Sequence, residues 1–119
     1  MTERERDLDI LDALVLYCSE IGEAVDHFGP DAEVFRSNSV YRNAVSMCLL
    51  QIGELSGRLS EDFRSAHPEI PWRNIRGLRN LLAHTYFSID ADTAWDILRD
   101  DVPVLREFCA AELERSSEE

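Results

Sequence analysis

The sequence predicts an all-α protein, an up-and-down bundle of four to five helices. Apolar residues recur at spacings of three and four along almost the whole chain, as they do in helices that bury one face. No stretch shows the alternation of apolar and polar residues that marks a β-strand. Proline and glycine gather at three points where we expect the chain to turn, Gly29-Pro30, His67-Pro68 and Ile70-Pro71.

The first predicted helix runs from about Glu5 to His27, and the Gly29-Pro30 pair ends it. Its expected apolar stripe consists of Ile10, Leu14, Tyr17, Ile21 and Ala24. A short helical turn through Phe35 should follow, because acidic residues stand at its start.

The second long helix is predicted from Ser39, as its N-cap, to about Leu59. Its expected core face consists of Val40, Ala44, Met47, Cys48, Leu55 and Leu59. Asn43 and Glu54 lie within about 40° of each other on an ideal helix, at the edge of that face. They sit either at a solvated boundary or in the wall of a cleft.

A short helix should follow, and the proline-rich elbow after it should leave His67 in solvent. From Trp72 a further helix is predicted to about Tyr86, with Leu78, Leu81 and Leu82 on its core side. Two glycines of the preceding long helix, Gly53 and Gly57, are either tolerated at the surface or placed there to let another helix approach closely.

Asp90 is the expected N-cap of the last helix, which should run from Ala91 to about Leu113. Pro103 lies inside this stretch and should kink or restart the helix, because proline cannot donate the intrahelical hydrogen bond. Residues 113–119 form an acidic tail that we expect to fray. Residues 1–119 are predicted to be a single domain.

The net charge of −12 argues against a broad basic face for nucleic acid. The segment between Phe63 and Ile89 is nevertheless basic, because only Glu69 opposes its arginines, Arg64, Arg73, Arg76 and Arg79. A locally basic cleft on an acidic body is therefore expected.

Three cysteines, Cys18, Cys48 and Cys109, stand far apart in helical apolar settings. We expect buried free thiols, with no disulfide and no metal site. The charged start of the chain does not resemble a signal peptide, and no apolar run approaches the ~20 residues that span a bilayer. These features predict a soluble, cytoplasmic protein.

The residues most suggestive of chemistry are Arg79-Asn80 and His84-x-Tyr86, which form the pattern R-N-x-x-x-H-x-Y. It combines a permanent cation with an imidazole that titrates near neutral pH. Such a pair can cleave phosphodiester bonds, the arginine holding phosphate and the histidine moving protons. Arg79 and His84 lie about 140° apart on an ideal helix, so they converge only if the helix unwinds or a second subunit supplies one of them. The structural alternative is that His84 caps helix carbonyls or packs against Trp72.

Several segments taken together resemble the HepT-like family of HEPN-domain proteins. They are Ile52-Gly53-Glu54, residues 67–73, residues 77–80, His84-x-Tyr86-Phe87 and Asp90, and Arg42-Asn43 fits as well. The resemblance covers about Asn38 to Phe108, which is most of the chain. It implies a HEPN-like helical bundle that forms a homodimer.

The resemblance also implies the toxin of a type VII toxin–antitoxin system, a metal-independent endoribonuclease that needs no cofactor of its own. The catalytic residues would be Arg79 and His84 at a dimer cleft, with Asn80 beside them. The implied antitoxin is a cognate minimal nucleotidyltransferase, which would use ATP and Mg²⁺ to attach AMP to Tyr86.

The remaining candidate residues have supporting roles. Glu54 either supports Arg79 through an ion pair or lies at a solvated boundary, and Asn43 is a supporting candidate on the same helix. Arg73 and Arg76 either contact RNA phosphates or serve surface solubility. The alternative function is a non-catalytic HEPN module that binds nucleotide or substrate for a nucleotidyltransferase, and a plain helical dimer is a third possibility.

Overall fold

The computed structural model describes the backbone of residues 1–84 and 90–119, and the side chains of residues 1–79 and 90–119. Every element of regular secondary structure in this part of the chain is a helix, which confirms the predicted all-α class. The elements in order are α1 (Glu3–Phe28), α2 (Ala32–Ser37), α3 (Ser39–Arg58), α4 (Glu61–Ala66), α5 (Trp72–His84), α6 (Ala91–Asp96), the π-helical segment η1 (Ile97–Asp101) and α7 (Val102–Ser117).

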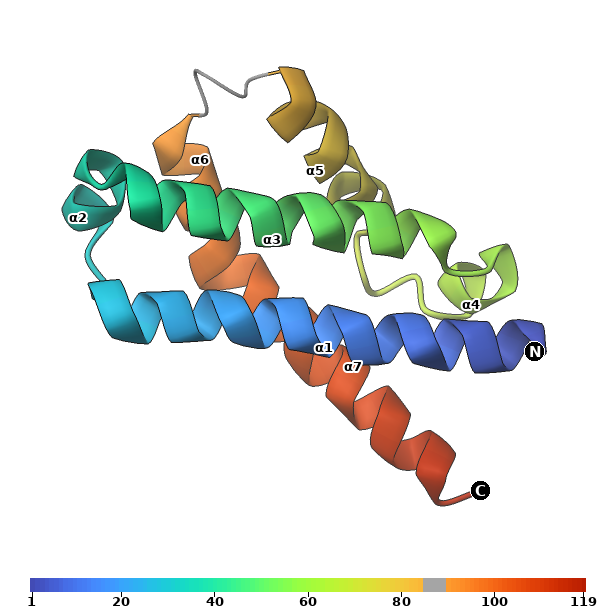
Figure 1. Cartoon of the computed structure of the whole chain (residues 1–119). Coiled ribbons are helices and arrows are strands. Elements are labelled where there is room, and N and C mark those ends of the chain that lie inside the picture. The colour runs from blue at the N-terminus through green and yellow to red at the C-terminus, as the bar shows by residue number, and fades with distance from the viewer. Residues whose placement is uncertain (85–89) are drawn as a thin grey trace.

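Four long helical segments form the bundle (Figure 1). Helices α1 and α3 lie side by side and antiparallel, α5 packs on α3, and α7 packs on α1. Helix α6 and segment η1 lead directly into α7, and together they make the fourth segment. The short helices α2 and α4 occupy the two turns on either side of α3. Among the described helices, none has an apolar stretch long enough to cross a bilayer.

Helix α1 begins two residues before its predicted start and ends where expected. The Thr2 side chain caps it by accepting a hydrogen bond from the Glu5 N–H at 3.1 Å. Gly29 ends it with φ of 106°, a left-handed conformation that glycine adopts without strain. The buried apolar residues are Leu11, Leu14, Cys18 and Ile21. The predicted stripe is confirmed at Leu14 and Ile21, and its other members, Ile10, Tyr17 and Ala24, are partly buried against the core. Leu11 and Cys18 are buried in addition, because α3 and α7 together cover α1.

Helix α3 has the predicted length but a different cap and a different buried face. Its N-cap is Asn38, not Ser39, because the Asn38 side chain accepts hydrogen bonds from the N–H groups of Val40 and Tyr41 at 3.0 and 3.2 Å. Val40, Ala44 and Met47 were predicted in the core but are exposed, with exposed fractions of 64% for Val40 and 56% for Met47. Cys48 and Leu59 are buried as predicted. The other buried residues of the helix are Tyr41, Val45, Leu49, Ile52, Gly53 and Ser56.

The orientation of α3 follows from its one aromatic residue. The Tyr41 ring stacks on Phe28 at 4.8 Å between centroids and meets Phe35 edge-on at 5.0 Å. The Tyr41 hydroxyl donates a hydrogen bond to the Gly29 carbonyl at 3.1 Å. Burying this large ring with its hydroxyl paired fixes which side of α3 faces α1, and it leaves Val40 outside.

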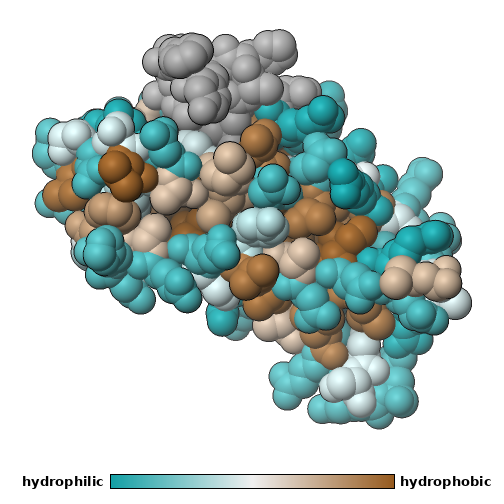
Figure 2. All heavy atoms as spheres, in the orientation of Figure 1, coloured by the Kyte–Doolittle hydropathy of each residue, from teal (hydrophilic) through white to brown (hydrophobic). Residues whose placement is uncertain are grey.

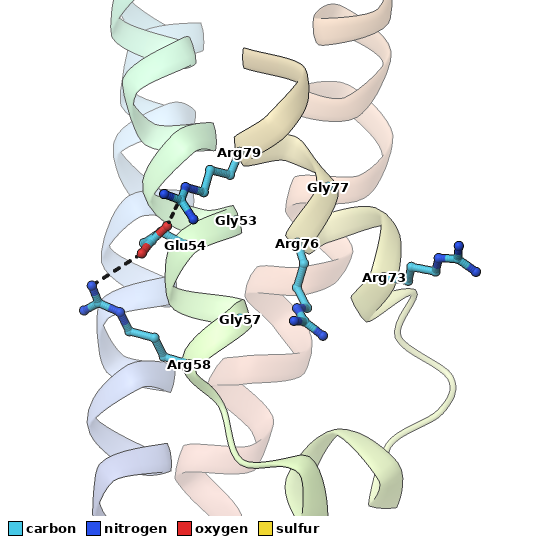
Figure 3. A pocket seen from close by; sticks show the side chains of 8 residues that line it. All are labelled: Gly53, Glu54, Gly57, Arg58, Arg73, Arg76, Gly77 and Arg79. Carbon is cyan, nitrogen blue, oxygen red and sulfur yellow. Dashed lines mark hydrogen bonds and ion pairs between the residues drawn. The ribbon is translucent and has the colours of Figure 1, made fainter. Parts of the chain in front are cut away.

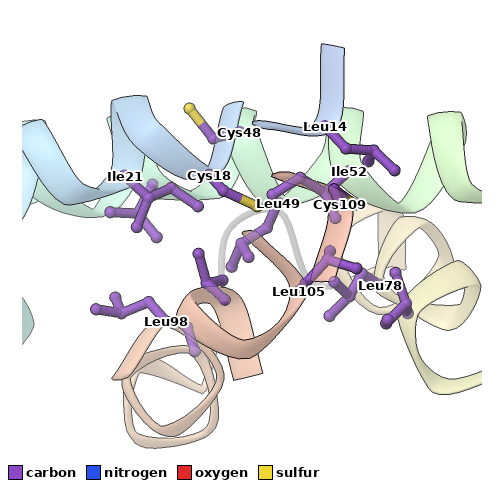
Figure 4. Close-up of a cluster of buried hydrophobic side chains, with 14 of the residues drawn as sticks. Leu14, Cys18, Ile21, Cys48, Leu49, Ile52, Leu78, Leu98, Leu105 and Cys109 are labelled. Atoms are coloured by element: carbon purple, nitrogen blue, oxygen red, sulfur yellow. The ribbon is translucent and has the colours of Figure 1, made fainter. Parts of the chain in front are cut away.

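The three cysteines lie in the core among leucine and isoleucine side chains from α1, α3 and α7 (Figure 4). All three are free and buried, as predicted. Burial raises the pKa of the Cys18 and Cys109 thiols to about 12 and that of Cys48 to about 11. These thiols belong to the packed interior, and the protonated form is the one that the interior favours.

The elbow before α5 is packed more tightly than predicted. The His67 side chain is only 18% exposed, and its ring lies 4.7 Å from the Phe63 ring and 5.1 Å from the Phe108 ring. The indole N–H of Trp72 donates to the His67 carbonyl at 2.9 Å. The prediction of a solvated His67 was therefore wrong, because its ring packs against the Phe63 and Phe108 rings.

The C-terminal helical segment follows the prediction at its start and in its middle. The Asp90 side chain accepts hydrogen bonds from the N–H groups of Asp92 and Thr93 at 3.1 and 3.4 Å. The π-helical segment η1 interrupts the α-helix just before Pro103, which is the expected effect of a residue without an N–H. The predicted end near Leu113 was wrong, since α7 stays helical to Ser117.

Candidate active site

A groove between α3 and α5 gathers four arginines on a chain whose net charge is −12 (Figure 3). Its volume is about 500 Å³, and one acidic residue stands among its lining side chains. The described lining consists of Gly53, Glu54, Gly57, Arg58, Arg73, Arg76, Gly77 and Arg79. The groove is thus a locally positive surface, and the predicted basic cleft on an acidic body is present.

The groove exists because α3 and α5 touch backbone to backbone at Gly53. A Cβ atom at this position would lie 3.0 Å from the Arg79 nitrogen and 3.0 Å from the Ile75 carbonyl oxygen. No residue larger than glycine fits there without moving α5. The close helix approach predicted from Gly53 and Gly57 is confirmed at Gly53, whereas a Cβ at Gly57 would meet Arg76 Nε at an ordinary 3.6 Å.

Glu54 sits next to this contact and joins two arginines. Its Oε2 lies 3.1 Å from Arg79 Nε, and its Oε1 lies 3.5 Å from Arg58 Nη2 (Figure 3). The ion pair between Glu54 and Arg79 that the sequence suggested is therefore present. A guanidinium carries five N–H donors, so pairing with one carboxylate leaves donors for a second anion such as phosphate.

The pair orients Arg79 more than it stabilises the fold. The side chains of Arg79 and Glu54 are 63% and 34% exposed. An ion pair with this much exposure to water contributes about 0–1 kcal/mol to stability. The carboxylate instead restricts the long Arg79 side chain to one wall of the groove, where the cation remains open to solvent.

The other predicted phosphate contacts differ from each other. The Arg76 side chain extends along the groove toward Gly57, whereas the Arg73 side chain points away from the other arginines (Figure 3). Asn43 is exposed near the start of α3 and is not part of the groove lining. The Asn80 and His84 side chains and all of Tyr86 fall outside the described residues.

Two arginines have roles that the sequence did not reveal. Arg64, counted in the basic segment, caps the C-terminus of α3, donating to the Gly57 carbonyl at 3.2 Å and the Ser56 carbonyl at 3.4 Å. Arg58 takes a place in the groove instead. Its position four residues after Glu54 was the available signal, because residues at that spacing are neighbours on a helix.

Comparison with known proteins identifies the family of this chain. A family model described as Ribonuclease HepT-like matches residues 17–112. A protein of Thermococcus cleftensis named "Probable ribonuclease HepT" is 35% identical over 95 residues, which cover 76% of this chain and 86% of the relative. A protein of Methanocaldococcus jannaschii, provisionally named as an RNase, is 42% identical over 76 residues, which cover 64% of this chain and 70% of the relative. No solved structure matches the chain.

The segment that the family model matches contains both helices that form the arginine groove. We conclude that the chain belongs to the HepT-like ribonuclease family.

Proposed function

We propose that this protein is a metal-independent endoribonuclease whose active site is completed by a second copy of the chain. The observation that carries the proposal is Arg79, held by Glu54 at 3.1 Å in a groove lined by three further arginines. Membership of a ribonuclease family supports RNA as the substrate of this groove.

The proposed reaction is a transesterification within the RNA strand. The 2′ oxygen of a ribose attacks the adjacent phosphorus, the bond to the 5′ oxygen breaks, and a 2′,3′-cyclic phosphate and a 5′-hydroxyl form. His84 takes the proton from the 2′-hydroxyl or gives one to the leaving 5′ oxygen. Arg79 stabilises the negative charge that builds up on the phosphorus-bound oxygens. Asn80 orients the phosphate or the imidazole.

Two observations support a homodimer. Helix α5 extends to His84, so the positions of Arg79 and His84 differ by about 140° in direction around the helix axis. The exposed apolar residues Val40 and Met47 lie fourteen and seven residues before Glu54, and residues at that spacing share one side of a helix. A second copy seated on this side of α3 would lie beside the groove. Figure 2 shows apolar surface gathered in a band across the face that α1 and α3 present.

We also propose that a nucleotidyltransferase antitoxin controls this ribonuclease by attaching AMP to Tyr86. Tyr86 stands two residues after His84 in the sequence. An added AMP carries a phosphate charge of about −1, which would compete with RNA for Arg79 and Arg76 at distances where salt screens incompletely. The role as the toxin of a toxin–antitoxin pair follows from this control.

Cleavage of RNA in EDTA tests the proposed reaction. The protein, purified without its partner, should cleave single-stranded RNA and leave 2′,3′-cyclic phosphate ends, with a rate that EDTA does not change. The dimer should be visible by sedimentation at micromolar concentration. An intact RNA pool after incubation with a folded dimer would contradict the proposal and favour the non-catalytic binding module, in which the arginines only hold nucleotide phosphates.

A further inference from the structure

Gly77 lies in the middle of α5, and nothing in the described part of the chain requires a glycine there. A Cβ atom at this position would meet no described atom within 4 Å. Its backbone needs no special freedom either, since Gly29 is the one described glycine with a positive φ. A glycine inside a helix is less stable than an alanine, because it loses more backbone freedom on folding. The bare position therefore weakens α5 without a gain in packing inside the chain.

The two glycines of α3 that line the same groove differ from Gly77, because each faces another part of the chain. A Cβ at Gly53 would lie 3.0 Å from the Arg79 nitrogen, and a Cβ at Gly57 would lie 3.6 Å from Arg76 Nε. Packing within the chain thus accounts for Gly53 and gives Gly57 a neighbour, but it leaves Gly77 open. The space at Gly77 is available to a molecule from outside.

Gly77 points away from the core of the bundle. It follows the buried Ile75 by two residues, which places it about 160° from Ile75 around the helix axis. Arg73, four residues before Gly77, is its neighbour on the helix surface, and both line the groove. In Figure 3 the Arg73 side chain extends from α5 on the side away from α3. The position of His84 follows Gly77 by seven residues, so Arg73, Gly77 and position 84 share one side of the helix, the outer side of α5.

We infer that the sugar–phosphate backbone of single-stranded RNA crosses the outer side of α5 in contact with Gly77, with one phosphate on Arg73. The inference rests on the proposed ribonuclease for the identity of the bound molecule. Arg73 is an exposed cation, whereas the exposed apolar residues Val40 and Met47 lie on α3. A cation beside bare backbone suits a polyanionic strand better than it suits the apolar centre of a protein interface.

Gly77 acts in this arrangement as a positioning residue. A Cβ atom would add a carbon about 1.5 Å beyond the Cα atom, on the side where the strand lies. Charge-assisted hydrogen bonds to phosphate are about 2.7–2.9 Å long and weaken when they are stretched by that much. A side chain at position 77 would therefore hold the strand away from Arg73 and from position 84.

The direct test compares Gly77 with Gly22 of α1, another helix-interior glycine whose Cβ would meet no described atom within 4 Å. Alanine or leucine at either position should raise the unfolding midpoint by about 2–6 °C, because both favour a helix over glycine. RNA binding is measured by fluorescence anisotropy with a labelled 2′-O-methyl oligonucleotide, which lacks the attacking hydroxyl and cannot be cleaved. We expect Gly77→Ala to weaken binding about threefold and Gly77→Leu about tenfold, whereas the Gly22 variants stay within about twofold of wild type.

The salt dependence of binding shows whether Gly77 acts through a phosphate contact. Each such contact contributes about 0.7 to the slope of log affinity against log salt for a single strand. Gly77→Leu changes no charge, yet it should lower the size of this slope by about 0.7, and Arg73→Gln should lower it equally. The double variant should lower it no further, because all three proteins lack the same contact. An unchanged slope in Gly77→Leu would overturn the inference.

A second copy of the chain is the competing occupant of the outer side. Sedimentation of Gly77→Leu and Gly22→Leu at micromolar concentration distinguishes the two occupants. Equal assembly of both variants, with weaker RNA binding in Gly77→Leu alone, supports the RNA contact. A dimer that dissociates in Gly77→Leu and persists in Gly22→Leu would assign the outer side to the second copy and overturn the inference.

Cleavage in EDTA separates this inference from the proposed ribonuclease. If wild type cleaves RNA and the Gly77 variants bind and cleave like the Gly22 variants, the RNA contact is wrong and the ribonuclease stands. If wild type cleaves nothing but Gly77→Leu alone loses affinity and salt slope, the RNA contact stands and the ribonuclease proposal fails.

Discussion

Two successive stretches of helix α3 are built on opposite principles. Along residues 41–49 the helix carries Tyr41, Val45 and Leu49, which are almost completely buried and fill space with large side chains. One turn later it carries Gly53, which has no side chain, so the backbones of α3 and α5 touch. The first stretch holds the bundle together. The second brings charged side chains from two helices to one groove, because the close contact keeps the Cα atoms of the two helices near each other. Stability and chemistry are thus carried by different stretches of one helix.

Removing the Tyr41 ring should give the largest loss of stability. Tyr41 is fully buried, so Tyr41→Ala should cost about 3–5 kcal/mol, as truncation of buried aromatic residues does. Tyr41→Phe loses only the hydrogen bond to the Gly29 carbonyl, about 0.5–1.5 kcal/mol. The neighbouring Val40→Ala is the control and should stay within about 0.5 kcal/mol, because Val40 is exposed. Urea unfolding measures all three, and equal losses at positions 40 and 41 would contradict the assigned face of α3.

Enlarging Gly53 should come next and should affect both stability and activity. In Gly53→Val the added atoms collide with the α5 backbone, so we expect a loss of about 1–3 kcal/mol and a groove forced open. Gly77→Ala is the matched control for stability, because a Cβ there meets nothing within 4 Å. Alanine favours a helix over glycine by about 1 kcal/mol, so the control should be as stable as wild type or slightly more so. A tolerated valine at position 53 would refute the close contact.

Neutralising Glu54 should slow catalysis with little change in stability. Glu54→Gln weakens the hold on Arg79, so kcat should fall about tenfold, a barrier change of about 1.4 kcal/mol, while KM stays near its wild-type value. Thermal stability should change by less than about 1 kcal/mol, because the pair is exposed.

The control for Glu54 is a second acid that pairs with arginine far from the groove. Asp100→Asn removes a partner of Arg99 and should leave kcat unchanged. In a double-mutant cycle, Glu54→Gln should cost nothing further once Arg79 is alanine. Additive losses in that cycle would mean that Glu54 acts independently of Arg79.

Changing Tyr86 to phenylalanine should have the smallest effect on the enzyme itself. Tyr86→Phe should cleave RNA like wild type but resist AMP transfer by the antitoxin, since it lacks the hydroxyl that accepts the group. Mass spectrometry should find added AMP on the wild-type peptide containing Tyr86 and none on the variant. Full neutralisation of an active Tyr86→Phe protein without any mass change would show that control is by binding alone.

The sequence was informative about helix ends and less so about helix orientation. Caps such as Asp90 and breakers such as Gly29 act within a few residues, so α1, α3 and α6 begin or end within two residues of their predicted limits. The buried face depends on which neighbours cover a helix. Apolar character alone therefore placed Val40 and Met47 in the core, where the structure has Tyr41 and Leu49.

In the candidate site, too, the sequence predicted some contacts correctly and missed others that depend on the fold. Glu54 and Arg79 were matched as partners and lie 3.1 Å apart. Arg64 was counted in the basic segment but caps α3, because the free carbonyls of a helix end attract a nearby guanidinium. Arg58 was missed since it precedes the basic segment in sequence and joins it only in the fold. The roles of His84, Asn80 and Tyr86 remain predictions.

The most direct test of the account is the single-turnover cleavage rate of a labelled RNA in EDTA, measured for wild type, Arg79→Ala and His84→Ala beside their thermal unfolding. Loss of a general acid–base or of a charge-stabilising group costs about a hundredfold or more in rate. We predict that both variants lose at least that much activity while their stability stays within about 1 kcal/mol of wild type. Cleavage at the wild-type rate by either folded variant, or activity lost only in step with unfolding, would contradict the account.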